Sequence, residues 1–112
     1  MARKKGNLPG ITSVVHYGNI ATGEIITDTA RTGEWLRSRD LVQRWVREKK
    51  VESALQGVVH TMAWAYLHAR TMGLAGTEGE PSYENMLAWL ELWDTDMRDE
   101  SDEDDGPLGV TD

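Results

Sequence analysis

The chain has 112 residues and a formal net charge of −7, and it contains no cysteine. This length fits one domain built around one hydrophobic core. The absence of cysteine excludes disulfides, thiolate metal sites and thiol catalysis, and it fits a reducing compartment. The charge is divided unevenly: residues 1–50 contain ten Lys or Arg against five Asp or Glu, and residues 51–112 contain two against fourteen. This asymmetry is compatible with head-to-tail self-association or with docking on charged partners, but a solvated surface together with a disordered acidic tail is the favoured explanation.

The first part of the chain predicts a basic arm followed by a hairpin. Residues 1–10 contain three basic side chains, two glycines and a proline, which is typical of a flexible arm, and no apolar stretch follows that would make a secretory signal. In residues 11–29, β-branched residues stand on either side of a turn near residues 18–23, which predicts two short strands. Such a hairpin is marginal alone and must pack on helices.

A first helix is expected to begin at Thr32 or Gly33, with Glu34 in its first turn. Its apolar stripe includes Trp35 and Trp45, and arginines occupy the other side. A bend is expected near residues 49–52.

Residues 51–72 carry the strongest pattern in the chain. Apolar residues recur every three or four positions, and Trp64 and Leu67 extend the apolar surface to a second face. The helix is expected to end at Gly73, because glycine tolerates the left-handed conformation. It contains too many polar groups for a bilayer, so no membrane partner is expected.

A third helix is expected to begin after Ser82, a good N-cap, and it too has apolar residues on two sides. Residues 94–112 contain nine acidic residues against one arginine, and they are expected to form a disordered acidic tail. The predicted fold is therefore mainly α. A short N-terminal β-hairpin packs on a bundle of about three helices within residues 11–93.

No residues are arranged for catalysis, and no cofactor or metal site is predicted. His60 and His68 are eight positions apart on one helix, a rise of about 12 Å, which is too far for them to share a metal ion. Glu24 and Asp28 stand isolated, and the acidic residues 102–105 lack the spacing of a calcium loop. The chain is therefore predicted not to be an enzyme. Nucleic-acid binding is not expected either, because the acidic second half would repel a polyanion.

Contact with a protein partner is the predicted function of the two-sided helices. Tryptophan is the residue type most enriched among interface anchors, and methionine adapts to imperfect pockets. Packing in the core is the alternative for each tryptophan. The candidate partner-binding residues are Trp64, Met86, Trp89, Leu92 and Trp93.

Several short motifs follow one another in a specific order. They are Asp40-Leu41-Val42 with Trp45, the run Met62-Ala63-Trp64-Ala65-Tyr66-Leu67 with Ala69-Arg70, then Gly73, Ser82-Tyr83-Glu84, and an acidic end before Pro107. Together they resemble the small tail assembly chaperones of long-tailed, siphovirus-type bacteriophages, across residues 12–108. The basic arm at residues 1–10 departs from that family. The aromatic residue of the last helix, often Phe in the family, is represented by Met86 or Trp89.

The resemblance implies a mostly helical protein that self-associates and coats the tape measure protein, keeping it soluble until the tail tube polymerises. It also implies a longer form, made by ribosomal frameshifting, that recruits the tail tube protein. The expected location is the host cell cytoplasm, with the protein absent from the mature virion. Two alternatives stay open: another phage structural or connector protein, and an acidic regulatory or inhibitory binding protein.

Overall fold

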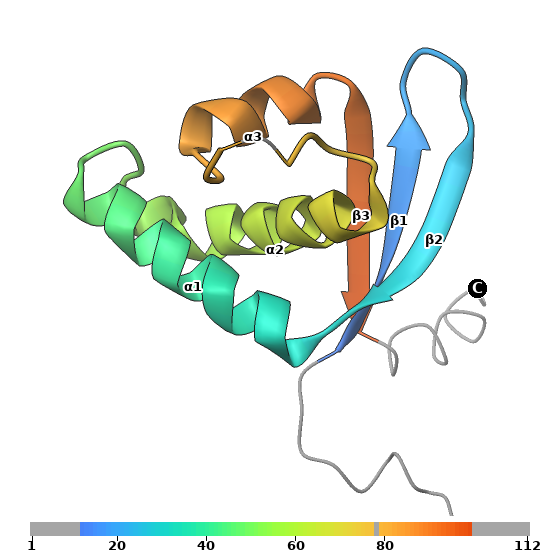
Figure 1. Cartoon of the computed structure of the whole chain (residues 1–112). Helices are drawn as coiled ribbons and strands as arrows, with labels where there is room; N and C mark the ends of the chain where they lie inside the picture. Colours follow the sequence, from blue (N-terminus) through green and yellow to red (C-terminus); the bar gives the residue numbers. More distant parts are fainter. Residues whose placement is uncertain (1–11, 78, 100–112) are drawn as a thin grey trace, which may run out of the picture.

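The structure of the chain is a computed structural model that describes residues 12–77 and 79–99. The helices all lie against one face of a three-stranded antiparallel sheet, so the domain has two layers (Figure 1). In chain order the elements are β1 (Ser13–Asn19), β2 (Ile25–Ala30), α1 (Thr32–Arg47), the 3₁₀ turn η2 (Ser53–Leu55), α2 (Gln56–Met72), α3 (Tyr83–Leu90) and β3 (Trp93–Asp99). The predicted hairpin and three helices are confirmed, but the architecture combines helices with a full sheet and is not mainly α.

The predicted hairpin supplies two of the three strands. β1 is the central strand, and it pairs antiparallel with β2 on one side and with β3 on the other. The side-chain oxygen of Asn19 accepts hydrogen bonds from the backbone N–H groups of Ala21 and Thr22, at 3.0 and 3.1 Å, and so closes the turn. Val15 and Tyr17 are fully buried, because they point from β1 toward the helices.

β3 contradicts the prediction of a disordered tail from residue 94 onward, as far as residues 94–99 are concerned. Trp93, Thr95 and Met97 are partly buried and alternate with the exposed Asp94 and Asp96, which is the two-residue period of a half-buried strand. Pairing with β1 along its whole length gives this polar segment its backbone hydrogen bonds. The predicted arm at residues 1–10 and the rest of the predicted tail, residues 100–112, lie outside the described residues.

Most helix boundaries follow the predicted signals, but α2 begins at Gln56, after η2, and not at residue 51, where its apolar pattern starts. α1 begins at Thr32, and the chain bends after it at Lys49, whose φ is 65°. α2 ends before Gly73, which has a left-handed φ of 83°. The hydroxyl of Ser82 accepts a hydrogen bond from the backbone N–H of Asn85 at 3.0 Å and caps α3. These caps satisfy backbone groups that a helix end leaves without partners.

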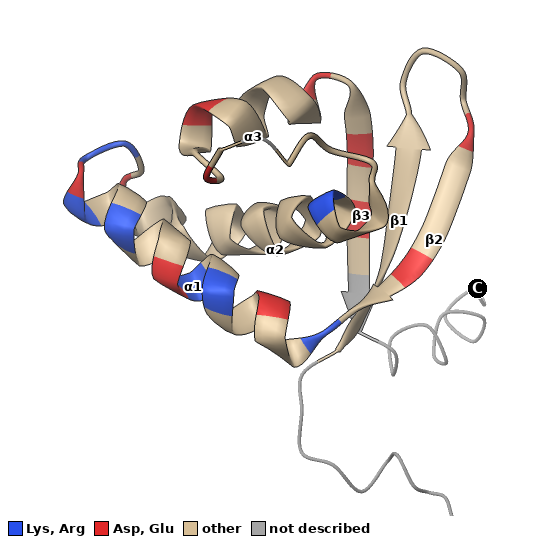
Figure 2. Cartoon of the chain, viewed as in Figure 1, with Lys and Arg blue, Asp and Glu red and all other residues tan. Residues whose placement is uncertain are grey.

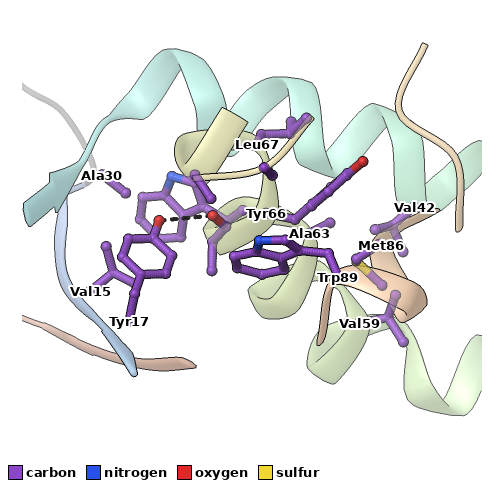
Figure 3. Close-up of a cluster of buried hydrophobic side chains, with 14 of the residues drawn as sticks. Val15, Tyr17, Ala30, Val42, Val59, Ala63, Tyr66, Leu67, Met86 and Trp89 are labelled. Carbon is purple, nitrogen blue, oxygen red and sulfur yellow. Dashed lines mark hydrogen bonds between the residues drawn. The ribbon is translucent and has the colours of Figure 1, made fainter. Parts of the chain in front are cut away.

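One hydrophobic core fills the space between the sheet and the helices. Tyr17 donates a hydrogen bond to the carbonyl oxygen of Ala65 at 2.8 Å, which ties β1 to α2 (Figure 3). Trp89 from α3 packs against Tyr17 and Tyr66, with ring centroids 5.9 and 5.6 Å apart. Among the helices in residues 12–77 and 79–99, none combines the length and the hydropathy needed to cross a bilayer.

Candidate functional site

The structure places three of the five predicted partner-binding residues inside the core. Trp64 and Trp89 are each 6% exposed, and Met86 is fully buried. The indole N–H of Trp64 donates to the carbonyl oxygen of Arg31 at 3.1 Å, and that of Trp89 donates to Leu74 at 3.2 Å. Figure 3 shows Met86 and Trp89 among the core side chains of α2 and β1. Because their apolar surface is already covered within the chain, these three residues form no docking face in this fold.

The other two predicted residues lie where α3 passes into β3. Leu92 is 62% exposed, whereas Trp93 is partly buried against the core. The carbonyl oxygen of Leu92 accepts a hydrogen bond from the backbone N–H of Ile20, at 3.1 Å, so the loop meets the hairpin turn there. Ile20 is 53% exposed as well. Leu92 is thus the only one of the five predicted residues that is largely exposed.

An ionic cluster, which we define as Asp28, Glu34 and His68, joins β2, α1 and α2. The Nδ1 atom of His68 lies 2.8 and 2.9 Å from the two carboxylate oxygens of Glu34, and its Nε2 atom lies 2.9 Å from Oδ2 of Asp28. His68 and Glu34 are buried, and the side chain of Asp28 is half exposed. Each ring nitrogen of His68 therefore faces a carboxylate, one from α1 and one from β2.

The pKa values of Asp28 and of the neighbouring Tyr17 differ from their usual values. The hydrogen bond from His68 holds the pKa of Asp28 below its usual value, helped by a backbone N–H and by the charges of His68 and Arg31. Burial raises the pKa of Tyr17, and the carboxylates of Glu34 and Asp28 raise it further. The contacts of His68 with Glu34 and Asp28 join α2 to α1 and to β2.

The chemistry open to the ionic cluster is limited by its geometry. Both ring nitrogens of His68 face carboxylates, so neither can contact a substrate without breaking one of these contacts. The two carboxylates lie on opposite edges of the ring, and in residues 12–77 and 79–99 no group of three or more His, Asp or Glu side chains is arranged so that it could hold a metal ion. The hydroxyl of Thr71, 3.3 Å from Glu34, links the cluster to the surface groove next to it. We interpret the cluster as the support of that groove.

The arginine groove, our candidate site, lies between α1, the C-terminal half of α2 and the loop of residues 73–81. It has a volume of about 720 Å³, within the range of ligand-binding clefts. Positions along α1 three or four residues apart form one wall, because such residues share a helix face. The groove is lined by Arg37, Asp40, Leu41, Arg44 and Arg47 from α1, by Leu67, Arg70 and Thr71 from α2, and by Thr77 and Pro81 from the loop.

Arg70 builds the loop wall of the groove. Its guanidinium group donates hydrogen bonds to the carbonyl oxygens of Gly76, Thr77 and Gly79 at 2.9 to 3.1 Å. It also lies over the ring of Tyr66, 6.0 Å from the centroid. One side chain thus fixes three loop carbonyls beside the C-terminal turn of α2.

The arginine groove is strongly cationic around an apolar floor. Four arginines surround Leu41, Leu67 and Pro81, against one lining acid, Asp40. Arg44 makes an exposed ion pair with Glu80, 3.8 Å long, and such a pair contributes little. Within the described part of the chain, Arg37 and Arg47 have no acidic partner. Figure 2 shows basic residues gathered on α1 and the turn after it, where acidic residues also occur, and it shows acidic residues on α3, β2 and β3.

The groove could not be predicted from the sequence. The helical spacing places the α1 arginines on one side of the helix, but nothing in the order of residues indicates that the loop after Gly73 folds back beside them. Asp28, Glu34 and His68 also come from three separate elements. The only available signal was the position of His68 on the apolar α2 helix. Comparisons of the chain with protein-family models, with curated proteins and with solved structures found no match.

Proposed function

We propose that this chain is a non-enzymatic tail assembly chaperone of the long-tailed phage type, and that the arginine groove binds a segment of the tape measure protein. The observation that carries the binding role is the combination of four guanidinium groups with an apolar floor. The order of sequence motifs described above supports the choice of family. The groove stands on α1 and α2, which the ionic cluster holds together, so its shape is set before a client arrives.

The chemistry of the groove defines the client segment. An amphipathic helix can lay its apolar side chains on Leu41 and Pro81, which are only partly buried, while acidic residues on its flanks reach the arginines. Arginine suits this task because its planar guanidinium group binds a carboxylate through two parallel hydrogen bonds. The client surface in this proposal is therefore the groove and not the surface expected from the sequence, which comprised Trp64, Met86, Trp89, Leu92 and Trp93.

Self-association belongs to the same proposal and would use a different surface. Ile20 and Leu92 are both more than half exposed and are joined by a backbone hydrogen bond, so a second copy could cover them at this end of the sheet. The proposal also retains a frameshifted longer form that binds the tail tube protein, action in the host cytoplasm, and absence from the virion.

Co-expression with the tape measure protein tests the client site. We expect the wild-type chain to keep the client soluble and to co-purify with it. The double variant Arg44→Gln/Arg47→Gln should lose about tenfold or more of the retained client, because two charge-assisted contacts disappear. The matched control is Arg39→Gln/Lys49→Gln, which removes the same charge from residues outside the groove and should retain the client within about twofold.

Two results would overturn the proposal. Equal client retention by the groove variant and its control would remove the groove as the client site. Detection of the chain at stoichiometric level in purified particles would instead support the connector alternative, since a chaperone leaves before the virion is complete.

A further inference from the structure

We infer that the arginine groove also has an occupant within the chain itself: the acidic segment of residues 100–112 docks there when no client is bound. The segment carries Glu100, Asp102, Glu103, Asp104, Asp105 and Asp112 and no Lys or Arg. It also contains Leu108 and Val110, which match the apolar floor. This inference uses the groove described above but does not depend on the identity of the client.

The topology brings the start of this segment close to the groove. β3 ends at Asp99, which pairs with Ser13, and Ser13 pairs in turn with Ala30 at the end of β2. α1 begins two residues later, at Thr32. Figure 1 shows the end of β3 and the start of α1 at the same edge of the domain. The segment therefore leaves the sheet beside the first turn of the helix that carries the groove arginines.

The length of the segment is sufficient to reach every arginine on α1. Arg37 and Arg47 lie about 8 and 23 Å along the helix axis from Thr32, at 1.5 Å per residue. Thirteen extended residues span up to about 43 Å. The segment can thus pass around the start of α1 and still lie along the whole groove.

The charges on the two sides are complementary. Arg37 and Arg47 have no acidic partner in residues 12–77 and 79–99, and the segment supplies six carboxylates. Each exposed ion pair contributes only tenths of a kcal/mol to about 1 kcal/mol. Docking within one chain nevertheless needs little affinity, because a short connection gives an effective concentration in the millimolar range.

Docking of this kind regulates access to the groove. A client meets only the fraction of molecules whose groove is open, so its apparent affinity falls by that fraction. If the segment occupied the groove nine-tenths of the time, client binding would weaken about tenfold. Only a segment that competes strongly, such as an acidic amphipathic helix, would then displace it.

The test uses the full chain without any client. Because the sequence contains no cysteine, Thr111→Cys gives one attachment point for a nitroxide spin label. We expect paramagnetic broadening at the backbone amides of the α1 groove wall and of Thr77, and none at the hairpin turn of residues 20–24. The signal loss at the groove should be about twofold or more, because the groove is occupied in most molecules.

The matched variants decide whether the arginines are responsible. In the labelled chain, Arg37→Gln/Arg44→Gln/Arg47→Gln should abolish the broadening at Thr77. The control Arg39→Gln/Lys49→Gln/Lys50→Gln, which removes the same charge outside the groove, should leave it unchanged. Broadening that survives the groove variant, or that covers the whole domain evenly, would overturn the inference. So would broadening of an unlabelled isotope-enriched chain mixed with labelled chain, because the segment would then dock between molecules. Since the sample holds no client, none of these results bears on the chaperone proposal.

Discussion

His68 lies between two carboxylates, and its removal would leave Glu34 buried without its main partner. We expect His68→Leu to lower the free energy of unfolding by about 3 kcal/mol, because an uncompensated buried charge costs several kcal/mol. Urea unfolding followed by circular dichroism measures this loss. Adding Glu34→Gln should restore at least half of it, since the amide is neutral and can still accept from the backbone N–H of Arg31. A loss below about 1 kcal/mol in the single variant would show that the contact is weak.

Asp28 makes the stability of the fold depend on pH in the acid range. Its pKa is lowered in the folded state by the hydrogen bond from His68, so it stabilises the fold above its unfolded pKa of about 3.9. This contribution is lost as the pH falls through the lower folded pKa. We expect Asp28→Asn to flatten the decline in the free energy of unfolding below about pH 4. The difference should stay near 1 kcal/mol or less, because the side chain is half exposed. Identical slopes of the free energy of unfolding against pH in the wild-type chain and in Asp28→Asn would contradict this prediction.

At the scale of elements, local signals located the hairpin, α1, α2 and the cap of α3. Gly73 and Ser82 act within a few residues, so the sequence predicts their effects directly. β3 was missed because its acidic composition resembles a tail, although Trp93, Thr95 and Met97 alternate with charged residues as a half-buried strand does. The pairing with β1 that orders it spans about 80 residues of sequence. No local pattern reports a contact of that range.

The same limit applies to α3, whose two apolar sides were interpreted as a partner surface. An eight-residue helix that packs on both α2 and the sheet has the same pattern, because either arrangement requires apolar residues on more than one face. Met86 is fully buried, and no pattern in the sequence around it indicates which side chains surround it. Sequence alone cannot distinguish cover by another part of the chain from cover by another molecule.

Substitutions at the end of α3 separate these two roles. Trp89→Ala should lower the free energy of unfolding by about 3–5 kcal/mol, because it empties a site between Tyr17 and Tyr66 and removes a hydrogen bond to Leu74. Leu92→Ala, three positions later and 62% exposed, should change it by less than about 0.5 kcal/mol. Chemical denaturation of both variants checks the contrast. Equal and small effects of the two substitutions would indicate that Trp89 is exposed. They would then support the partner-binding residues expected from the sequence as the client site.

At the scale of the whole molecule, charge segregation joins the groove to the rest of the chain. The arginines of α1 belong to the basic first half, and the acidic segment 100–112 belongs to the acidic second half. A net charge of −7 predicts weak binding to any polyanion. A groove covered by the acidic segment predicts the same result for a different, local reason. The net-charge explanation and the covered-groove explanation predict different polyanion binding when acidic residues are neutralised either in the segment 100–112 or elsewhere on the surface.

Retention on a heparin column distinguishes the local effect from the global one. Neutralising Asp102, Glu103, Asp104 and Asp105 to the corresponding amides uncovers the arginines, and we expect elution at clearly higher salt than for the wild-type chain. The control neutralises Glu24, Glu52, Glu91 and Asp94, which are exposed and line no part of the groove. Both variants have the same net charge. Because only the first frees the guanidinium groups, it should bind heparin more tightly than the control. Equal retention of the two variants would assign the effect to net charge alone.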